Sequence, residues 1–227
     1  MNRSIQMVIS MLALLKIGAA YLPIDTNHPK DRVDYLLSNI SAKKLLISNE
    51  FLDKYNDYDQ KMVFDQFWAN RFNYSLNSSS TKEFGNNIAY ILYTSGSTGM
   101  PKCVEIQQNC LHNFLLSMQK EPGITAADTM LSITTITFDI AELGIYLPLI
   151  SGASLHIVDM EVARDGRKLL EVIKKENISI VQATPFTWRM MLEFGWEEKF
   201  YARKFSLSED SRILDFLDRI AEVPAHL

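Results

Sequence analysis

The stretch YTSGSTGMPK, residues 93–102, decides how this chain of 227 residues is interpreted. An apolar and aromatic run at residues 88–93 leads into it and predicts a buried strand. Residues 103–106 predict a second strand after it. The loop between them consists almost wholly of hydroxyl-bearing residues and glycines, and Pro101 and Lys102 close it. We therefore expect a strand, a loop and a second strand here.

The composition of this loop suits an anionic ligand. Gly96 and Gly99 let the backbone approach a ligand closely, and successive N–H groups of such a turn can form a concave nest for phosphate oxygens. Lys102 adds a positive charge. An ordinary Ser/Gly turn is the alternative, and the loop is not a Walker A sequence, because no Gly-Lys-Ser/Thr follows at the required spacing. The hydroxyl donors are Thr94, Ser95, Ser97 and Thr98.

Residues 93–104 resemble the phosphate-binding signature of the adenylate-forming superfamily, Y-T-S-G-S-T-G-x-P-K-G-V. Cys103 stands where that family normally has glycine. The resemblance implies ATP as the ligand, with Mg²⁺ as its accompanying ion. It also implies a set of nucleotide- and phosphate-binding residues, namely Thr94, Ser95, Gly96, Ser97, Thr98, Gly99 and Lys102.

A second stretch, LKIGAAYLPID at residues 15–25, resembles a structural core motif of the amino-acid adenylation domains of nonribosomal peptide synthetases. The apolar run at residues 7–15, preceded by Arg3, also imitates a signal peptide. Lys16 interrupts that run, which is too short to span a bilayer. We expect a buried helix followed by a strand, with an apolar helical face formed by Ile5, Val8, Ile9, Leu12 and Leu15.

An aspartate, Asp139, stands at the start of the apolar segment at residues 137–149. It is either a helix cap that accepts backbone N–H bonds or a buried anion that awaits a cationic substrate group, and the residues alone leave both open. The sequence FDIA at residues 138–141 resembles the family motif F-D-x-S/A, in which the aspartate pairs with the α-ammonium of an amino acid. Gly144 departs from the glutamate that is usual at its place. The resemblance implies four substrate-binding residues, Asp139, Ile140, Leu143 and Gln182.

Strands and helices alternate along most of the chain, which predicts right-handed βαβ units and an α/β fold with a mostly parallel sheet flanked by helices. By resemblance this is an incomplete part of the large N-terminal domain of the adenylate-forming fold. Residues 51–82 are polar and predict an irregular segment. Strands are expected at residues 43–48, 130–134, 155–158 and 178–182, and helices at residues 29–40, 111–118, 139–149 and 167–176. Residues 183–192 resemble the family's A-T-P-A-T-W segment, which implies that a strand gives way to a helix there.

Composition indicates a globular protein, since 47% of residues are hydrophobic and 22% are charged. A net charge of −4 argues against a nucleic-acid partner, and the apolar run gives no reason to expect a membrane partner. Cys103 and Cys110 form no Cys-x-x-Cys pair, so neither a zinc site nor a disulfide framework is expected. A reducing cytoplasm is the expected location.

The resemblance covers about residues 3–199. We expect a partial AMP-binding domain at residues 1–199 and a divergent tail at residues 200–227, with a short amphipathic helix that Ser208 caps and that ends before Pro224. The later family motifs, including Y-G-P-T-E and the lysine of the small C-terminal domain, have no counterpart, so no catalytic set is complete in this chain.

The expected function follows from the resemblance: an ATP-binding part of an adenylation domain, derived from an enzyme that forms aminoacyl-AMP and releases pyrophosphate, and lacking full turnover as a separate chain. The implied partners are ATP, an amino acid, the remainder of a synthetase and a phosphopantetheinyl carrier domain. Two alternatives remain. One is a non-catalytic nucleotide-binding or interaction fragment, and the other is a remnant of an acyl-CoA or aryl-acid ligase, against which Asp139 speaks.

Overall fold

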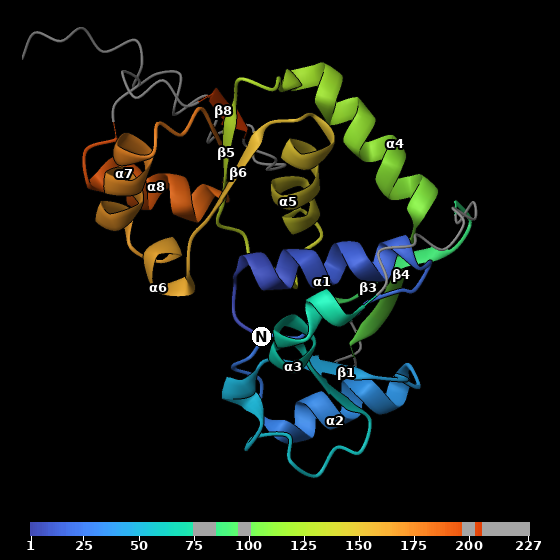
Figure 1. The fold of residues 1–227 in the computed structure, drawn as a ribbon. Helices are drawn as coiled ribbons and strands as arrows, with labels where there is room; N and C mark the ends of the chain where they lie inside the picture. Colours follow the sequence, from blue (N-terminus) through green and yellow to red (C-terminus); the bar gives the residue numbers. More distant parts are fainter. Residues whose placement is uncertain (75–84, 95–100, 197–202, 206–227) are drawn as a thin grey trace, which may run out of the picture. The chain divides into compact units, whose positions relative to one another are not determined.

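The computed structural model describes residues 1–74, 85–94, 101–196 and 203–205. The chain divides into two compact units, Met1–His112 and Asn113–Leu227, and each is described by itself. The predicted α/β class is confirmed, because helices flank a parallel sheet (Figure 1). One helix, α4 (Gln108–Met118), begins in the first unit and ends in the second.

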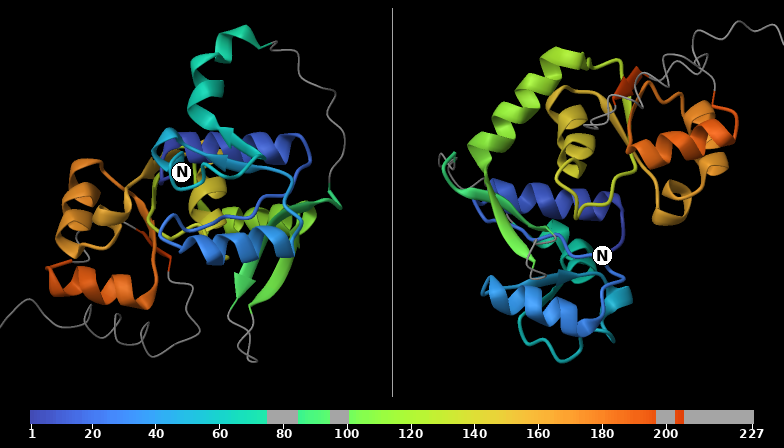
Figure 2. Two further views of the ribbon diagram at one scale, coloured as in Figure 1. Left: turned by 90° about the horizontal axis from the view of Figure 1, so that it is seen from below. Right: turned by 180° about the vertical axis from the view of Figure 1, so that it is seen from behind.

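The first unit holds two pairs of strands. Strands β1 and β2 pair in parallel, and strands β3 and β4 pair as an antiparallel hairpin (Figure 2, left). The sequence predicts an irregular segment at residues 51–82, but β2 and α3 lie within it. Strand β2 has three residues, too few for a periodic pattern, and its pairing with β1 stabilises it. The elements are α1 (Ile5–Lys16), α2 (Lys30–Asn39), β1 (Leu45–Ile47), η1 (Asn49–Phe51), β2 (Lys61–Val63), α3 (Phe64–Ala69), η2 (Arg71–Asn73), β3 (Ile88–Thr94) and β4 (Lys102–Gln107).

Helix α1 is confirmed, but the predicted apolar face is only partly buried: Val8 is buried, whereas two other residues of that face are exposed. Ile5 is 69% exposed and Leu12 is 40% exposed. Apolar residues occur on nearly every side of this helix, so its periodicity does not determine which side is buried. The strand expected after α1 is reduced to a single bridge between Tyr21 and Tyr90, whose rings stack. The buried residues of α1 are Met7, Val8, Ser10 and Met11.

The second unit is built on four parallel strands in the order β6-β5-β7-β8. The chain passes from β5 to β6 on one side, returns across β5 to β7, and continues to β8. Right-handed crossovers in opposite directions place their helices on opposite faces of the sheet. Figures 1 and 2 show α5 on one side of β5 and β6, and α7 and α8 on the other. The elements are η3 (Gln119–Gly123), β5 (Thr129–Ser132), α5 (Ala141–Ile150), β6 (Ser154–Ile157), α6 (Met160–Ala163), α7 (Gly166–Lys175), β7 (Ile180–Gln182), α8 (Pro185–Glu193) and β8 (Arg203–Phe205).

The side chains of the central strands divide between these two faces. Leu131 of β5 and Val181 of β7 are register partners, and both belong to the buried cluster that contains the apolar residues of α7 and α8. Met130 and Ile180, the preceding pair, are fully buried. Because successive side chains of a strand point to opposite faces, this pair packs on the α5 side. The cluster residues from α7 and α8 are Leu169, Leu170, Ile173, Trp188 and Met191.

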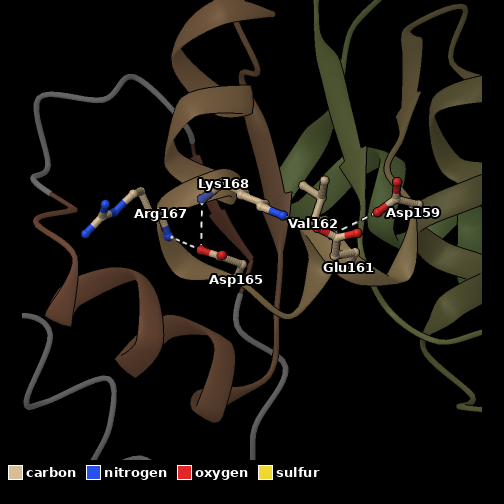
Figure 3. Close-up of polar contacts among 6 residues, drawn as sticks. All are labelled: Asp159, Glu161, Val162, Asp165, Arg167 and Lys168. Carbon is tan, nitrogen blue, oxygen red and sulfur yellow. Dashed lines mark hydrogen bonds and ion pairs between the residues drawn. The ribbon is translucent and has the colours of Figure 1, made fainter.

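Carboxylates fix the turn between α6 and α7 (Figure 3). Asp159 caps α6, since its side chain accepts a hydrogen bond from the Val162 N–H at 2.8 Å. Asp165 caps α7 by accepting from the N–H groups of Arg167 and Lys168, at 2.9 and 3.1 Å. These caps satisfy N–H groups in the first turn of each helix. The Lys168 ammonium also pairs with the carboxylate of Glu161.

A three-residue strand, β8, pairs in parallel with β7 and places Phe205 opposite Gln182 in the register. The sequence predicts no strand at residues 203–205, because so short a segment carries no periodic signal. The helix expected from Ser208 onward lies outside the described residues.

Candidate functional site

The order of the strands marks one edge of the sheet as the place for a ligand. Strands β5 and β7 are neighbours, but the chain leaves β5 toward one side of the sheet and β7 toward the other. In α/β folds the carboxyl ends of two such strands form a crevice in which ligands bind. Strand β5 ends at Ser132 and β7 ends at Gln182. This edge is therefore the candidate site of the second unit on topology alone.

A hydrogen bond joins the two strand ends at this edge. The hydroxyl of Thr134 donates to the amide oxygen of Gln182 at 2.9 Å. Gln182 is only 3% exposed, and a buried amide is costly unless it is hydrogen-bonded. Gln182 is predicted from the sequence as a site residue, whereas Thr134 is not. The sequence does show a hydroxyl residue close to the end of a strand. It indicates a contact with Gln182 only once β5 and β7 are known to be neighbours.

Asp139 lies on the connection between β5 and α5. Helix α5 begins at Ala141 with Ile140 as its capping residue, and no side chain caps it, so the interpretation of Asp139 as a helix cap is wrong. The reason is a preceding turn, in which the Ala141 N–H donates to the Phe138 carbonyl at 3.1 Å. Asp139 is also exposed rather than buried, so its carboxylate is open to an incoming cationic group. Its pairing with an ammonium stays a prediction.

The other two predicted substrate residues belong to the start of α5. Ile140 is half-buried and Leu143 is fully buried. Helix α5 is buried from Ala141 to Pro148, as expected for a helix that is apolar on all sides. Glu142 is fully buried within this helix and is not among the predicted site residues, although a single acid in so apolar a helix is a visible signal. All four predicted substrate residues thus follow the carboxyl ends of β5 and β7 or lie at them.

The predicted phosphate loop lies in the first unit, at the tip of the β3–β4 hairpin. Thr94 and Lys102 are exposed register partners, so they form the last pair of the antiparallel ladder before the loop. Cys103, in place of the family's glycine, lies within β4. The predicted phosphate-binding residues Ser95, Gly96, Ser97, Thr98 and Gly99 lie outside the described residues.

The loop end of this hairpin is attached to helix α2. Tyr93 precedes Thr94 on β3, and its hydroxyl donates a hydrogen bond to the side-chain oxygen of Asn39 on α2. Burial raises the pKa of the Tyr93 hydroxyl above its usual value. The two strands that carry the loop are therefore anchored next to it.

Comparison with known proteins identifies the family. The family model described as "AMP-binding enzyme" matches residues 1–216. The dimodular nonribosomal peptide synthase of Bacillus subtilis is 40% identical over 194 residues, which is 84% of this chain and 8% of that protein. The PKS-NRPS hybrid synthetase acdB of Aspergillus candidus is 35% identical over 202 residues, covering 87% of this chain and 8% of the synthetase.

Solved structures that are similar to this chain support the same family assignment. A four-domain nonribosomal peptide synthetase bound to AMP and glycine superposes with a TM-score of 0.80 at 30% identity, covering 95% of this chain and 16% of that chain. The N-terminal subdomain of Klebsiella oxytoca NpsA, in complex with 3-hydroxyanthranilyl-AMSN, gives a TM-score of 0.72 at 27% identity, covering 86% of this chain and 48% of that subdomain.

The chain therefore belongs to the family of AMP-binding enzymes, and it resembles part of a nonribosomal peptide synthetase adenylation domain. It spans 8% of each of the two curated relatives. The family match reaches residue 216 and thus includes β8 and part of the segment that the sequence analysis assigns to a tail. In the part of the chain that the structure describes, no helix has the length and apolar character that crossing a membrane requires.

Proposed function

We propose that this chain supplies the ATP-binding loop and the amino-acid site of an adenylation domain of the nonribosomal peptide synthetase type. In that reaction a carboxylate oxygen of the amino acid attacks the α-phosphorus of ATP. A bond forms between these two atoms, the bond from the α-phosphorus to the bridging oxygen of the β-phosphate breaks, and pyrophosphate leaves. The observation that carries the proposal is the exposed carboxylate of Asp139 at the edge of the sheet where Thr134 and Gln182 join β5 to β7.

In this proposal the amino acid is oriented by charge. Asp139 pairs with the α-ammonium, while Ile140, Leu143 and Gln182 limit the space for the side chain. Fixing the ammonium restricts the orientation of the reacting carboxylate, and orientation of this kind can supply a large part of a rate enhancement. The four-domain synthetase that resembles this chain was solved with AMP and glycine, which supports a site for a nucleotide and an amino acid.

The nucleotide is held, in this proposal, at the tip of the β3–β4 hairpin. Thr94 and Lys102 stand at the two ends of the loop. The hydroxyl and N–H groups that the sequence provides at residues 95–99 are proposed to bind phosphate oxygens. Lys102 provides a positive charge that attracts the phosphate oxygens of the bound nucleotide.

Magnesium is implied by the family, and its fit can be judged from the donor groups. In the described part of the chain no three His, Cys, Asp or Glu residues are grouped so that they could hold a metal ion. Mg²⁺ commonly keeps several waters and binds through substrate phosphates with only one or two carboxylates. We therefore assign no described residue to the ion and derive no step through it.

The proposal extends to location and partners. Cys103 and Cys110 are both free thiols, which suits a reducing cytoplasm. The relatives are multidomain synthetases, so the remainder of a synthetase and a phosphopantetheinyl carrier domain are the partners that we propose.

Thermal unfolding of the purified chain tests the nucleotide site. A ligand that binds only the folded state raises the midpoint, by an amount equivalent to about 2.7 kcal/mol at 100 times its Kd. We expect millimolar Mg-ATP to raise the midpoint of the wild type and of Lys43→Ala, an exposed control in the same unit, but not of Lys102→Ala. An equal shift in Lys102→Ala would refute the assignment of this lysine, and no shift in any variant would refute the proposed nucleotide site.

The amino-acid site is tested in the same way. We expect an amino acid added with Mg-ATP to raise the midpoint further in the wild type and in Asp53→Asn, an exposed control, but not in Asp139→Asn. A further shift that survives in Asp139→Asn would contradict the role proposed for Asp139.

A further inference from the structure

The side chains predicted to line the amino-acid site are already buried by the chain itself. Leu143 is 0% exposed and Gln182 is 3% exposed. A side chain that lines an open pocket retains accessible surface, because no protein atoms cover its ligand-facing side. The space beside Gln182 is therefore largely filled. Asp139, which belongs to the same candidate site, is nevertheless exposed.

Thr134 is the residue that holds Gln182 in this filled arrangement. Gln182 ends β7, whereas Thr134 follows β5, and their hydrogen bond of 2.9 Å links residues 48 positions apart. Glutamine is a long and flexible side chain, and a hydrogen bond to its amide oxygen selects one of its orientations. If the Thr134 donor were lost, the buried amide oxygen would lose this partner, and Gln182 would gain by turning toward water.

We propose that Thr134 is a positioning residue that keeps Gln182 folded into the crevice, and that the site consequently takes only an amino acid with a very small side chain, glycine or alanine. This inference rests on the proposed function, since it assumes that an amino acid binds at Asp139. A larger side chain has to displace the Gln182 amide and break its hydrogen bond, which costs affinity. Glycine and alanine leave that bond intact.

Three substitutions test whether the hydroxyl of Thr134, rather than the shape of its side chain, restricts the site. Thr134→Val keeps the branched shape but removes the O–H donor, whereas Thr134→Ser keeps the donor. Gln182→Ala removes the side chain that fills the space. If the hydrogen bond restricts the site, Thr134→Val and Gln182→Ala both admit leucine, and Thr134→Ser does not.

The test is isothermal titration calorimetry with glycine, alanine and leucine on the full chain in the presence of Mg-ATP. The wild type and Thr134→Ser are expected to bind glycine at least about tenfold more tightly than leucine, the discrimination that a hydrophobic or steric difference of this size supports. In Thr134→Val and Gln182→Ala we expect this preference to fall to within about threefold, mainly because leucine binds better. Circular dichroism and the urea midpoint check that each variant is folded.

Two results overturn the inference while the proposed function stands. One is a wild type that binds leucine as tightly as glycine, and the other is an unchanged preference in folded Thr134→Val; in both, Asp139→Asn still abolishes binding. If no amino acid binds the wild type, or if Asp139→Asn binds glycine normally, the proposed function fails, and this inference fails with it.

Discussion

Gly166, the first residue of α7, permits the close approach of α7 to α8. A Cβ atom at this position would lie 2.7 Å from the carbonyl oxygen of Met190 and 2.7 Å from a ring carbon of Phe194. The ring could turn away, but the carbonyl belongs to the backbone of α8, so the helix itself would have to move. Overpacking of this kind typically costs about 1–3 kcal/mol. Alanine regains at most about 1 kcal/mol through its higher helix propensity. Because the clash at 2.7 Å is with backbone, we place the cost at the upper end of this range, and after the gain in helix propensity we expect Gly166→Ala to lower the free energy of unfolding by about 2 kcal/mol.

Gly144 in α5 provides a matched control for this prediction. A Cβ atom there would lie 3.9 Å from the Cα and the hydroxyl oxygen of Ser132, which is ordinary van der Waals contact. Gly144 stands inside a helix, where alanine is favoured by up to about 1 kcal/mol. The same substitution is thus expected to destabilise the protein at one helical glycine and to stabilise it at the other.

Equilibrium unfolding in urea, followed by tryptophan fluorescence, measures both effects. Trp188 and Trp196 are buried, their rings meet edge to face at 5.5 Å, and both belong to the cluster that contains residues of α7 and α8. With a typical slope of about 2 kcal/mol per molar urea, a loss of 2 kcal/mol lowers the midpoint by about 1 M. A Gly166→Ala midpoint equal to or above that of the wild type would refute the reasoning, as would a loss of equal size in Gly144→Ala.

Three further predictions concern polar groups. Asp165→Ala removes the cap of α7 and should lower the free energy of unfolding by about 1 kcal/mol, whereas Asp165→Asn should cost less; equal losses in urea would contradict this. Asp128→Ala should cost about 3 kcal/mol, because the buried carboxylate accepts hydrogen bonds from the Thr125 N–H and hydroxyl and from the Ser179 hydroxyl; a loss below 1 kcal/mol by the same assay would be contrary evidence. Burial raises the pKa of the Tyr93 hydroxyl above about 10, the usual value in an unfolded chain. Below about pH 10 this difference does not affect stability, and as the pH rises from there the unfolded state ionises first, so the folded state is increasingly destabilised. Tyr93→Phe should therefore lose less stability than the wild type between pH 8 and pH 10.5, and parallel losses would argue against this.

The fold was predictable where the sequence pattern is strong and local. Pro29 precedes α2, and the apolar residues of α7 repeat on one helical face, so both helices lie within about one residue of the expected position. The face of α1 was not predictable, because an apolar run satisfies several helical faces equally. Strand β2 was missed because pairing with β1, which is distant in the sequence, stabilises it.

In the candidate site, too, the residues with local signals were predictable and a long-range contact was not. Asp139, Ile140, Leu143 and Gln182 could be named from local motifs, because each belongs to a short segment with a recognisable pattern. The role of Thr134 could not be predicted in this way, because its partner Gln182 is 48 positions away and no local pattern around Thr134 indicates that contact. Their hydrogen bond exists because the chain crosses over β5 on its way from β6 to β7, which makes β5 and β7 neighbours. The direction of a crossover is a property of the whole unit. Contacts that depend on this direction, such as the one between Thr134 and Gln182, therefore cannot be predicted from a local motif.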